Sequence, residues 1–283
     1  MKAMIFAAGL GTRLKPLTDN RPKALIVVAG KPMLEHVILK LKSAGFDEII
    51  INVHHFANQI LAFLEANDNF GINIQISDET EALLDTGGGM EKALPLFLTT
   101  DFEKLQDFIS DSCYSDTGEI AISKENISML EKMLGKYKSE AYLIHNVDII
   151  SNCDLKELMD FHQSFDTAPH ATLLVSKRPT SRYLLFDENN MLCGWVNKDT
   201  METKPLGFRY EEGMYKEYAY SGIQVVNFML YGYLPAGQYS IIDFYLSMCH
   251  KLKIQCYVKE DLQLMDIGKP ETLEKAEEFL KKI

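Results

Sequence analysis

The first part of the chain alternates short apolar segments with amphipathic segments, and this alternation constrains the fold most strongly. Apolar runs of strand length cover residues 2–8, 48–53 and 72–76. Between them, residues 33–45 and 57–64 carry apolar side chains at helical spacing. Strands that alternate with helices form a parallel sheet with helices on its faces. We therefore predict an α/β fold with three layers, α/β/α, around a mixed and mostly parallel sheet.

The second part of the chain adds further strands to this pattern. A buried strand over residues 141–148 ends in a carboxylate, and a helix is predicted at 271–283. Further strand-like runs lie at 171–176, 183–186, 223–227 and 254–258. Residues 99–140 are polar and lack a period except for a helical stretch at 127–137, so we interpret them as an insertion. No Pro- or Ser-rich linker divides the chain, so we expect one domain over residues 1–283.

The overall composition excludes several classes of protein. The formal net charge is −11, which argues against a nucleic-acid partner. No stretch approaches the roughly 18 apolar residues of a membrane-spanning helix, and the N-terminal apolar run is short for a signal peptide. The 5 cysteines are scattered without CxxC spacing, which favours reduced thiols in a cytoplasmic enzyme. Without a membrane-spanning stretch, no membrane partner is expected.

The charge of the first 31 residues differs from that of the rest. Residues 1–31 hold six basic side chains and one acid, a local charge of +5, whereas the remaining 252 residues sum to −16. A positive island in a negative chain indicates a local anionic ligand. Gly9 and Gly11 directly follow the first strand, where glycine lets backbone N–H groups approach a phosphate. The dinucleotide fingerprint fails at Leu14 and the P-loop pattern fails at Pro32, so neither of those sites is predicted.

A longer ordered pattern surrounds this glycine loop. It consists of Gly9-Leu10-Gly11-Thr12-Arg13-Leu14, Pro16-Leu17-Thr18, Pro22-Lys23-Ala24-Leu25 and Ala29-Gly30-Lys31-Pro32-Met33. The pattern strongly resembles the signature of sugar-1-phosphate nucleotidyltransferases, which have a Rossmann-like nucleotide-diphospho-sugar transferase fold. The resemblance implies that Arg13 and Lys23 are catalytic residues on the triphosphate. It also implies a nucleotide-binding half at about 1–150 and a sugar-binding half at about 151–283.

Further motifs match the same family. Thr86-Gly87-Gly88-Gly89 resembles the loop that packs on the nucleobase, and Asn146-Val147-Asp148 and Met265-Asp266 resemble the two metal motifs, with Val147 where the family more commonly has Gly. The implied nucleotide-binding residues are Ala8, Gly9, Gly11, Thr12, Thr86, Gly87 and Gly88. The implied sugar-binding residues are Asn146, Ser221, Gly222 and Lys198, with Lys204 as a competing alignment for Lys198. Asp148 and Asp266 are the implied ligands of a Mg²⁺ cofactor.

Elementary chemistry agrees with these roles. Nucleotidyl transfer joins two anions, and Arg13 offers a planar fork for phosphate oxygens while Lys23 offers a point charge. Mg²⁺ prefers oxygen ligands, typically one or two carboxylates with phosphates and water. Asp148 and Asp266 each follow a predicted strand, and ligands of open α/β sheets bind at the carboxyl ends of strands.

The substrate pair is expected from the resemblance alone. The glycine turn that leads into Lys92–Leu96 looks most like that of N-acetylmuramate-1-phosphate uridylyltransferases of cell-wall recycling, so UTP is expected rather than GTP. Mannose-1-phosphate guanylyltransferase and glucose-1-phosphate uridylyl- or thymidylyltransferase activity remain alternatives. A regulatory subunit that only senses an NDP-sugar is an alternative of another class, but it is expected to lack Arg13, Lys23 or a metal ligand. The chain is expected to be a monomer or a homodimer.

Overall fold

The computed structural model describes residues 1–97 and 140–283. The insertion predicted at about 99–140 and its helix at 127–137 therefore lie outside the described residues, apart from Glu140.

A parallel sheet forms the first half of the molecule. β1 (Lys2–Phe6) lies between β4 (Glu48–Val53) and β6 (Ala141–Asn146), and β5 (Asn73–Asp78) follows β4 at the edge. All four strands are parallel, as the alternation of strands and helices predicts. Their carboxyl ends therefore meet at one edge of the sheet.

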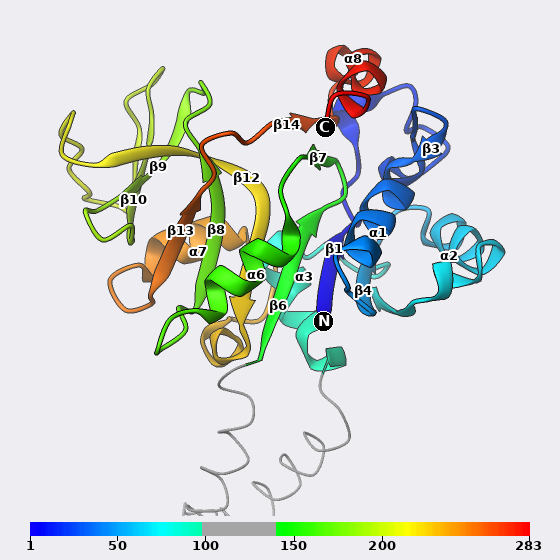
Figure 1. Cartoon of the computed structure of the whole chain (residues 1–283), viewed down its shortest axis with the longest axis horizontal. Helices are drawn as coiled ribbons and strands as arrows, with labels where there is room; N and C mark the ends of the chain where they lie inside the picture. Colours follow the sequence, from blue (N-terminus) through cyan, green and yellow to red (C-terminus); the bar gives the residue numbers. More distant parts are fainter. Residues whose placement is uncertain (98–139) are drawn as a thin grey trace, which may run out of the picture.

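The second half of the chain extends this sheet with antiparallel strands. β12 (Lys216–Asn227) is antiparallel to β6, and β8 (Ala171–Ser176) is antiparallel to β12. β13 (Ile254–Val258) is parallel to β8. The first part of β12 also pairs with a hairpin, so that β12 curves between the hairpin and the central sheet (Figure 1). This hairpin consists of β9 (Arg182–Phe186) and β10 (Leu192–Asn197), and it is extended by β11 (Thr203–Lys204). Within the described residues the sheet has ten strands and is mixed, as predicted. Strands from the predicted nucleotide-binding half and from the predicted sugar-binding half belong to this same sheet.

Helices cover both faces of the sheet, because successive strand residues point to opposite sides. Ile5 and Ile51 belong to one core, which also contains apolar side chains of α1, α2, α6 and α8. Met4 and Ile50 belong to the other core, which contains side chains of α3 and α7. The bounds of these helices are α1 Met33–Ser43, α2 Ala57–Ala66, α3 Asp85–Ala93, α6 Leu155–Gln163, α7 Ile241–Met248 and α8 Pro270–Leu280. The three predicted layers are confirmed, and the organisation into a single domain stays a prediction.

Short elements lie outside the main sheet. Two small antiparallel pairs join β2 (Val27–Val28) to β3 (Lys31–Pro32) and β7 (Ile149–Ser151) to β14 (Leu264–Asp266). The described part of the chain also has 3-10 turns at Thr12–Leu14, Lys23–Leu25, Asp68–Gly71, Leu94–Phe97 and Phe228–Tyr233. In residues 1–97 and 140–283, no helix is both long enough and apolar enough to span a membrane.

Two predicted boundaries differ from the structure. β6 ends at Asn146, so Asp148 lies in the turn between β6 and β7 rather than on a strand. The glycines at 87–89 lie inside α3, which begins at Asp85, and not in a turn before it. Glycine is unfavourable inside a helix, so the reason for its presence must be tertiary packing rather than local propensity.

Candidate active site

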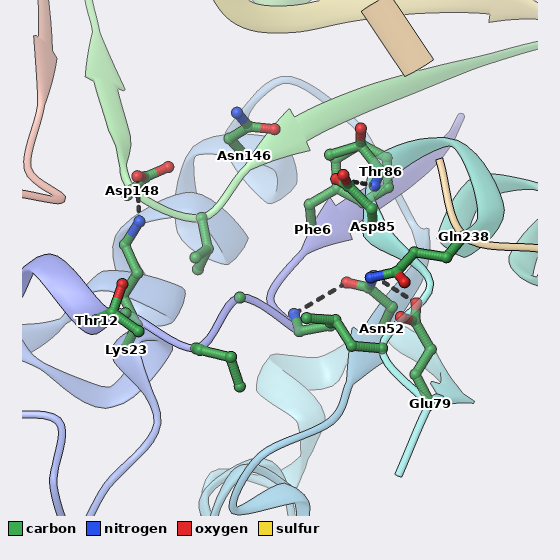
Figure 2. Close-up of a pocket in the computed structure, with 16 residues that line it drawn as sticks. Phe6, Thr12, Lys23, Asn52, Glu79, Asp85, Thr86, Asn146, Asp148 and Gln238 are labelled. Carbon is green, nitrogen blue, oxygen red and sulfur yellow. Dashed lines mark hydrogen bonds and ion pairs between the residues drawn. The ribbon is translucent and has the colours of Figure 1, made fainter. Parts of the chain in front are cut away.

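A cavity of about 420 Å³ opens where the parallel strands end, and we call it the strand-end cavity (Figure 2). Its lining consists of Phe6, Ala8, Gly9, Leu10, Gly11, Thr12, Lys23, Asn52, Glu79, Leu83, Asp85, Thr86, Asn146, Val147, Asp148 and Gln238. Ligands of α/β proteins bind at this edge of the sheet. The structure therefore brings together, in one cavity, Ala8, Gly9, Gly11, Thr12, Lys23, Thr86, Asn146 and Asp148 from the predicted site.

The glycine loop packs directly on Lys23. Gly11 has a φ of +64°, and a Cβ on it would lie 2.9 Å from the Cβ of Lys23 and 2.9 Å from Cγ2 of Thr18. The Thr18 hydroxyl donates a hydrogen bond to the Gly11 carbonyl at 3.0 Å. Gly11 is therefore needed both for its left-handed backbone and for the close approach to Lys23.

Lys23 and Asp148 form an ion pair at one end of the cavity (Figure 2). Each of the two side chains is only 12% exposed. The pair is thus largely shielded from solvent, where opposite charges attract more strongly than at the surface.

The two predicted metal ligands converge around Gly268. A Cβ on Gly268 would lie 2.7 Å from Oδ2 of Asp148 and 2.8 Å from Oδ1 of Asp266. Their approach follows from backbone pairing, because Asp266 of β14 lies opposite Ile149 of β7 and the Ile267 N–H donates to the Asp148 carbonyl at 2.9 Å. Residues 118 positions apart in the sequence therefore present carboxylates to one small space.

This pair of carboxylates fits the donor set of a magnesium ion. Within the described residues, no group of three or more His, Cys, Asp or Glu side chains is placed to hold a metal ion. Mg²⁺ is commonly held by one or two carboxylates, with substrate phosphates and water in the other positions. Asp148 and Asp266 therefore suit an ion that arrives with a triphosphate rather than one buried in an all-protein cage.

Arg13 lies beside the second carboxylate. Its Nη1 is 3.7 Å from Oδ2 of Asp266, and the two side chains are 54% and 40% exposed. Arg13 does not line the strand-end cavity, although its neighbour Thr12 does. The loose and exposed pairing leaves the guanidinium free to turn toward an anion.

Sequence reasoning missed Asn52 and Glu79, which lie at the opposite end of the cavity (Figure 2). Both side chains are almost fully buried. Oδ1 of Asn52 accepts hydrogen bonds from the N–H groups of Ala7 at 2.7 Å and Ala8 at 3.3 Å, and its Nδ2 donates to Oε1 of Glu79 at 2.7 Å. Oε2 of Glu79 accepts from the N–H of Leu84 at 3.1 Å. Polar residues at the ends of two adjacent parallel strands are the signal that could have identified them.

The glycines of α3 have different neighbours from those predicted. Gly87 and Gly88 do not line the cavity, and a Cβ on them would overlap the Tyr239 ring and the Gly237 carbonyl oxygen, respectively. The N–H of Gly87 also donates to the Tyr239 carbonyl at 2.8 Å. These glycines therefore let residues 237–239 approach α3, which places Gln238 in the cavity.

Thr86 and Gly89 contact other neighbours of α3. Thr86 lines the cavity, and its hydroxyl oxygen accepts a hydrogen bond from the N–H of Ile241 at 3.0 Å. A Cβ on Gly89 would lie 2.6 Å from Oε1 of Glu79. The glycine run is thus explained by packing on both sides of the helix.

The predicted sugar residues are only partly brought together. A Cβ on Gly222 would lie 2.8 Å from Nδ2 of Asn146, so Gly222 adjoins the cavity through Asn146. The Ser221 hydroxyl is buried and accepts a hydrogen bond from the Ile223 N–H at 3.2 Å, and Ser221 does not line the cavity. Its side chain therefore supports the strand rather than facing a ligand.

Lys198 also lies outside the strand-end cavity. Its Nζ is 2.7 Å from Oε1 of Glu217 and 4.5 Å from the centroid of the Tyr210 ring. Although burial acts to lower the pKa of Lys198, its hydrogen bonds to Glu217 and Tyr210 raise that pKa above its ordinary value. Lys204 from the competing alignment is likewise paired, at 2.8 Å from Oδ1 of Asp243. Both lysines are therefore ion-paired in this structure, and the contact of Lys198 with a sugar phosphate stays a prediction.

Comparison with known proteins adds evidence from sequence. The sequence profile of the family described as Nucleotidyl transferase matches residues 2–283. N-acetylmuramate alpha-1-phosphate uridylyltransferase of Caulobacter vibrioides is 48% identical over 96 residues, which cover 33% of this chain and 40% of that protein. Mannose-1-phosphate guanylyltransferase 1 of Arabidopsis thaliana is 33% identical over 178 residues, which cover 62% of this chain and 38% of that protein. The matched regions thus span less than half of each relative's length.

Solved structures share the fold. The structure of HddC from Yersinia pseudotuberculosis complexed with GMP-PN superposes with a TM-score of 0.64 at 18% identity, covering 99% of both chains. The inositol-1-phosphate CTP transferase from T. maritima gives a TM-score of 0.63 at 14% identity, covering 99% of this chain and 95% of that chain. At such low identity these neighbours establish the fold alone, and they agree with the predicted α/β architecture.

Proposed function

The chain belongs to the nucleotidyl transferase family, and from this membership we propose that it joins a nucleoside triphosphate to a sugar 1-phosphate. The products are an NDP-sugar and pyrophosphate. The observation that carries the proposal is that Lys23, Asp148 and the glycine loop line one end of the strand-end cavity, and that Asp266, which lies just outside the lining, converges with Asp148 there. Two carboxylates beside two cations suit a reaction between anionic phosphates.

The proposed reaction is an in-line substitution at the α-phosphorus. An oxygen of the sugar phosphate forms a bond to the α-phosphorus while the bond from that phosphorus to the bridging oxygen of the β-phosphate breaks, and pyrophosphate leaves. The attacking phosphate is already ionised, so no general base is required. Lys23 and Arg13 offset the repulsion between the two anions and hold the triphosphate in position.

The metal role is part of the same proposal. Asp148 and Asp266 would hold Mg²⁺, which when bound supplies further neutralisation of phosphate charge. Removal of the ion by a chelator is therefore expected to abolish turnover. Asp148→Asn and Asp266→Asn should each abolish Mg²⁺-dependent activity while leaving the chain folded, and the double variant should lose little more.

The far end of the cavity supports a choice of nucleobase. Glu79 presents a carboxylate, which accepts hydrogen bonds and, when ionised, cannot donate them. Both oxygens of Glu79 already accept hydrogen bonds, from Asn52 and from the Leu84 N–H, and each has a further lone pair. A carboxylate that faces the ring nitrogen of the pairing edge meets an N–H donor in uracil and guanine, but a lone pair beside the amino group in adenine and cytosine. An oxygen in that position favours UTP and GTP over ATP and CTP. Because the uridylyltransferase of Caulobacter vibrioides has a higher identity in its matched region than the Arabidopsis guanylyltransferase, 48% against 33%, UTP is the proposed substrate.

The choice of sugar and of cellular setting rests on the Caulobacter vibrioides relative more than on the geometry of the cavity. We propose N-acetylmuramate 1-phosphate as the acceptor and cell-wall recycling as the role, with mannose 1-phosphate and glucose 1-phosphate as alternatives. A cytoplasmic location is supported by the four described cysteines, Cys153, Cys193, Cys249 and Cys256, all of which are free thiols. Arg13, Lys23, Asp148 and Asp266 are all present, which favours an enzyme over a regulatory sensor.

A matrix of nucleotides against sugar phosphates tests the proposal. UTP, GTP, dTTP, CTP and ATP are each combined with the three sugar 1-phosphates, and pyrophosphate release is measured with Mg²⁺. Lys23→Ala and Arg13→Ala should lower turnover by about 10²–10³-fold with the best pair. Lys15→Ala is the matched control, because Lys15 is exposed and pairs with Asp19 at 3.6 Å in the same loop. Absence of turnover with every pair would contradict the proposal and favour the sensor.

A further inference from the structure

An ammonium group lies beside the space that the two carboxylates face. The position of a Cβ on Gly268 lies 2.9 Å from Nζ of Lys23, as well as 2.7 Å from Oδ2 of Asp148 and 2.8 Å from Oδ1 of Asp266. Lys23 forms its ion pair with the same Oδ2 of Asp148 that faces Gly268. A positive charge therefore already neutralises Asp148 beside the place where the carboxylates converge, while Asp266 pairs with Arg13 rather than with Lys23.

The two ion pairs at this place differ in strength. The side chains of Lys23 and Asp148 are each 12% exposed, whereas Arg13 and Asp266 are 54% and 40% exposed at a separation of 3.7 Å. Solvent weakens the exposed pair much more than the shielded one. The contact between Lys23 and Asp148 is thus the one that an entering cation must disrupt.

Backbone hydrogen bonds hold the main chain of Asp148 and the carboxylate of Asp266 in place. The N–H of Ile267 donates to the Asp148 carbonyl at 2.9 Å, and the N–H of Gly268 donates to Oδ1 of Asp266 at 2.8 Å. The backbone of Lys23 is held by the glycine loop, but its ammonium ends a flexible four-carbon stem. Lys23 can therefore swing toward a phosphate while Asp148 and Asp266 stay in place.

We infer that Lys23 holds the place of the metal ion in the nucleotide-free protein, so that the ion and the triphosphate bind together and each binds weakly alone. The inference rests on the proposed function, which supplies both ligands. An ion that binds alone must displace Lys23 and leave its ammonium unpaired beside the new cation. A triphosphate that binds alone draws Lys23 away and leaves Asp148 uncompensated beside anionic phosphates. When both bind, Lys23 moves to the phosphates and the ion moves to the carboxylates, which makes their binding mutually favourable.

Metal binding without nucleotide tests the inference directly. The full chain is titrated with Mn²⁺ alone, and free Mn²⁺ is followed by its electron paramagnetic resonance signal. Lys23→Met removes the ammonium at similar side-chain length, and it should tighten Mn²⁺ binding by about tenfold or more relative to the wild type. Asp148→Asn added to Lys23→Met should cancel the gain, because the carboxylate that was freed is then missing.

Matched variants separate this effect from a general change of charge. Lys15→Met also removes one cation from the loop, but Lys15 pairs with Asp19 at the surface, and this variant should bind Mn²⁺ like the wild type. Lys23→Gln is measured beside Lys23→Met, and thermal unfolding checks that each variant is folded. If one of the two variants does not fold, the Mn²⁺ affinity of the other still tests the inference.

The outcomes are distinct from those of the proposed function. Tighter Mn²⁺ binding by a folded Lys23 variant, with no change for Lys15→Met, supports the inference even if the nucleotide matrix shows no turnover. Equal or weaker Mn²⁺ binding by the folded Lys23 variants overturns it, even if the enzyme is active. An equal gain for Lys15→Met also overturns it, because the effect would then be general electrostatics.

Discussion

Asn52 is expected to organise the nucleobase end of the strand-end cavity, and replacing it with Ala tests this role. The side chain forms three hydrogen bonds, to the N–H groups of Ala7 and Ala8 and to the carboxylate of Glu79. Each buried group left without a partner costs about 1–3 kcal/mol, and more when it is charged. Water from the adjoining cavity can replace part of this loss, so we expect Asn52→Ala to destabilise the fold by about 3 kcal/mol.

The same substitution should affect nucleotide binding. The backbone after β1 and the Glu79 carboxylate both lose their shared partner, and both line the cavity. We expect about a tenfold rise in KM for UTP and a smaller preference for UTP over CTP, since the acceptor is no longer held in place.

Two assays and one control check this prediction. Urea unfolding gives the change in stability, and initial rates give KM and kcat/KM for UTP and CTP. Gln59→Ala is the control, because its Nε2 donates an exposed hydrogen bond to the Asn20 carbonyl at 2.9 Å, and its loss should cost less than about 0.5 kcal/mol. Wild-type stability and an unchanged KM in Asn52→Ala would refute the assigned role.

Two further predictions concern stability. A methyl group on Gly88 would overlap the backbone carbonyl of Gly237, so Gly88→Ala should lower the free energy of unfolding in urea by at least about 2 kcal/mol, although Ala has the better helix propensity. Gly232→Ala is the control and should be nearly neutral, because a Cβ there meets nothing within 4 Å. Equal effects of the two substitutions would disprove the packing argument. Burial lowers the pKa of His162 to about 4 in the folded chain. In the unfolded chain the same side chain is protonated near pH 6.5. The contribution of neutral His162 to the free energy of unfolding is complete above pH 6.5 and is lost as the pH falls toward 4. His162→Asn should therefore remove about 2 kcal/mol of the stability difference between pH 7.5 and pH 5. An unaltered dependence of stability on pH would contradict this.

The sequence could predict the features that depend on local pattern. The alternation of apolar strands and amphipathic helices is sufficient for the parallel sheet, because each helix must cover a strand face. The glycine loop after the first strand is predicted for a similar reason, since phosphate sites of this kind need close backbone approach. Asp148 and Asp266 are implied by family resemblance and come together through the pairing of β7 with β14.

Other parts of the site depend on contacts that no local pattern encodes. Asn52 lies within a predicted strand, and its importance follows from the register that places its amide beside Glu79 on the next strand. Gly87 and Gly88 resemble nucleotide-binding glycines, but their neighbours are residues 237–239, about 150 positions away in the sequence. Lys198 matches only a fragment of a family motif, and its partner Glu217 lies on β12. Motif resemblance predicts a chemistry for the cavity but does not indicate which side chains pack behind it.

A crystal structure with Mg²⁺ and a non-hydrolysable UTP analogue tests the central claim most directly. We expect the uracil at the Asn52–Glu79 end of the strand-end cavity and the α-phosphate beside Lys23. We also expect that Lys23 has left Asp148 and that one ion contacts both Asp148 and Asp266. A nucleotide bound in the reverse direction, or an ion that contacts neither carboxylate, would contradict it.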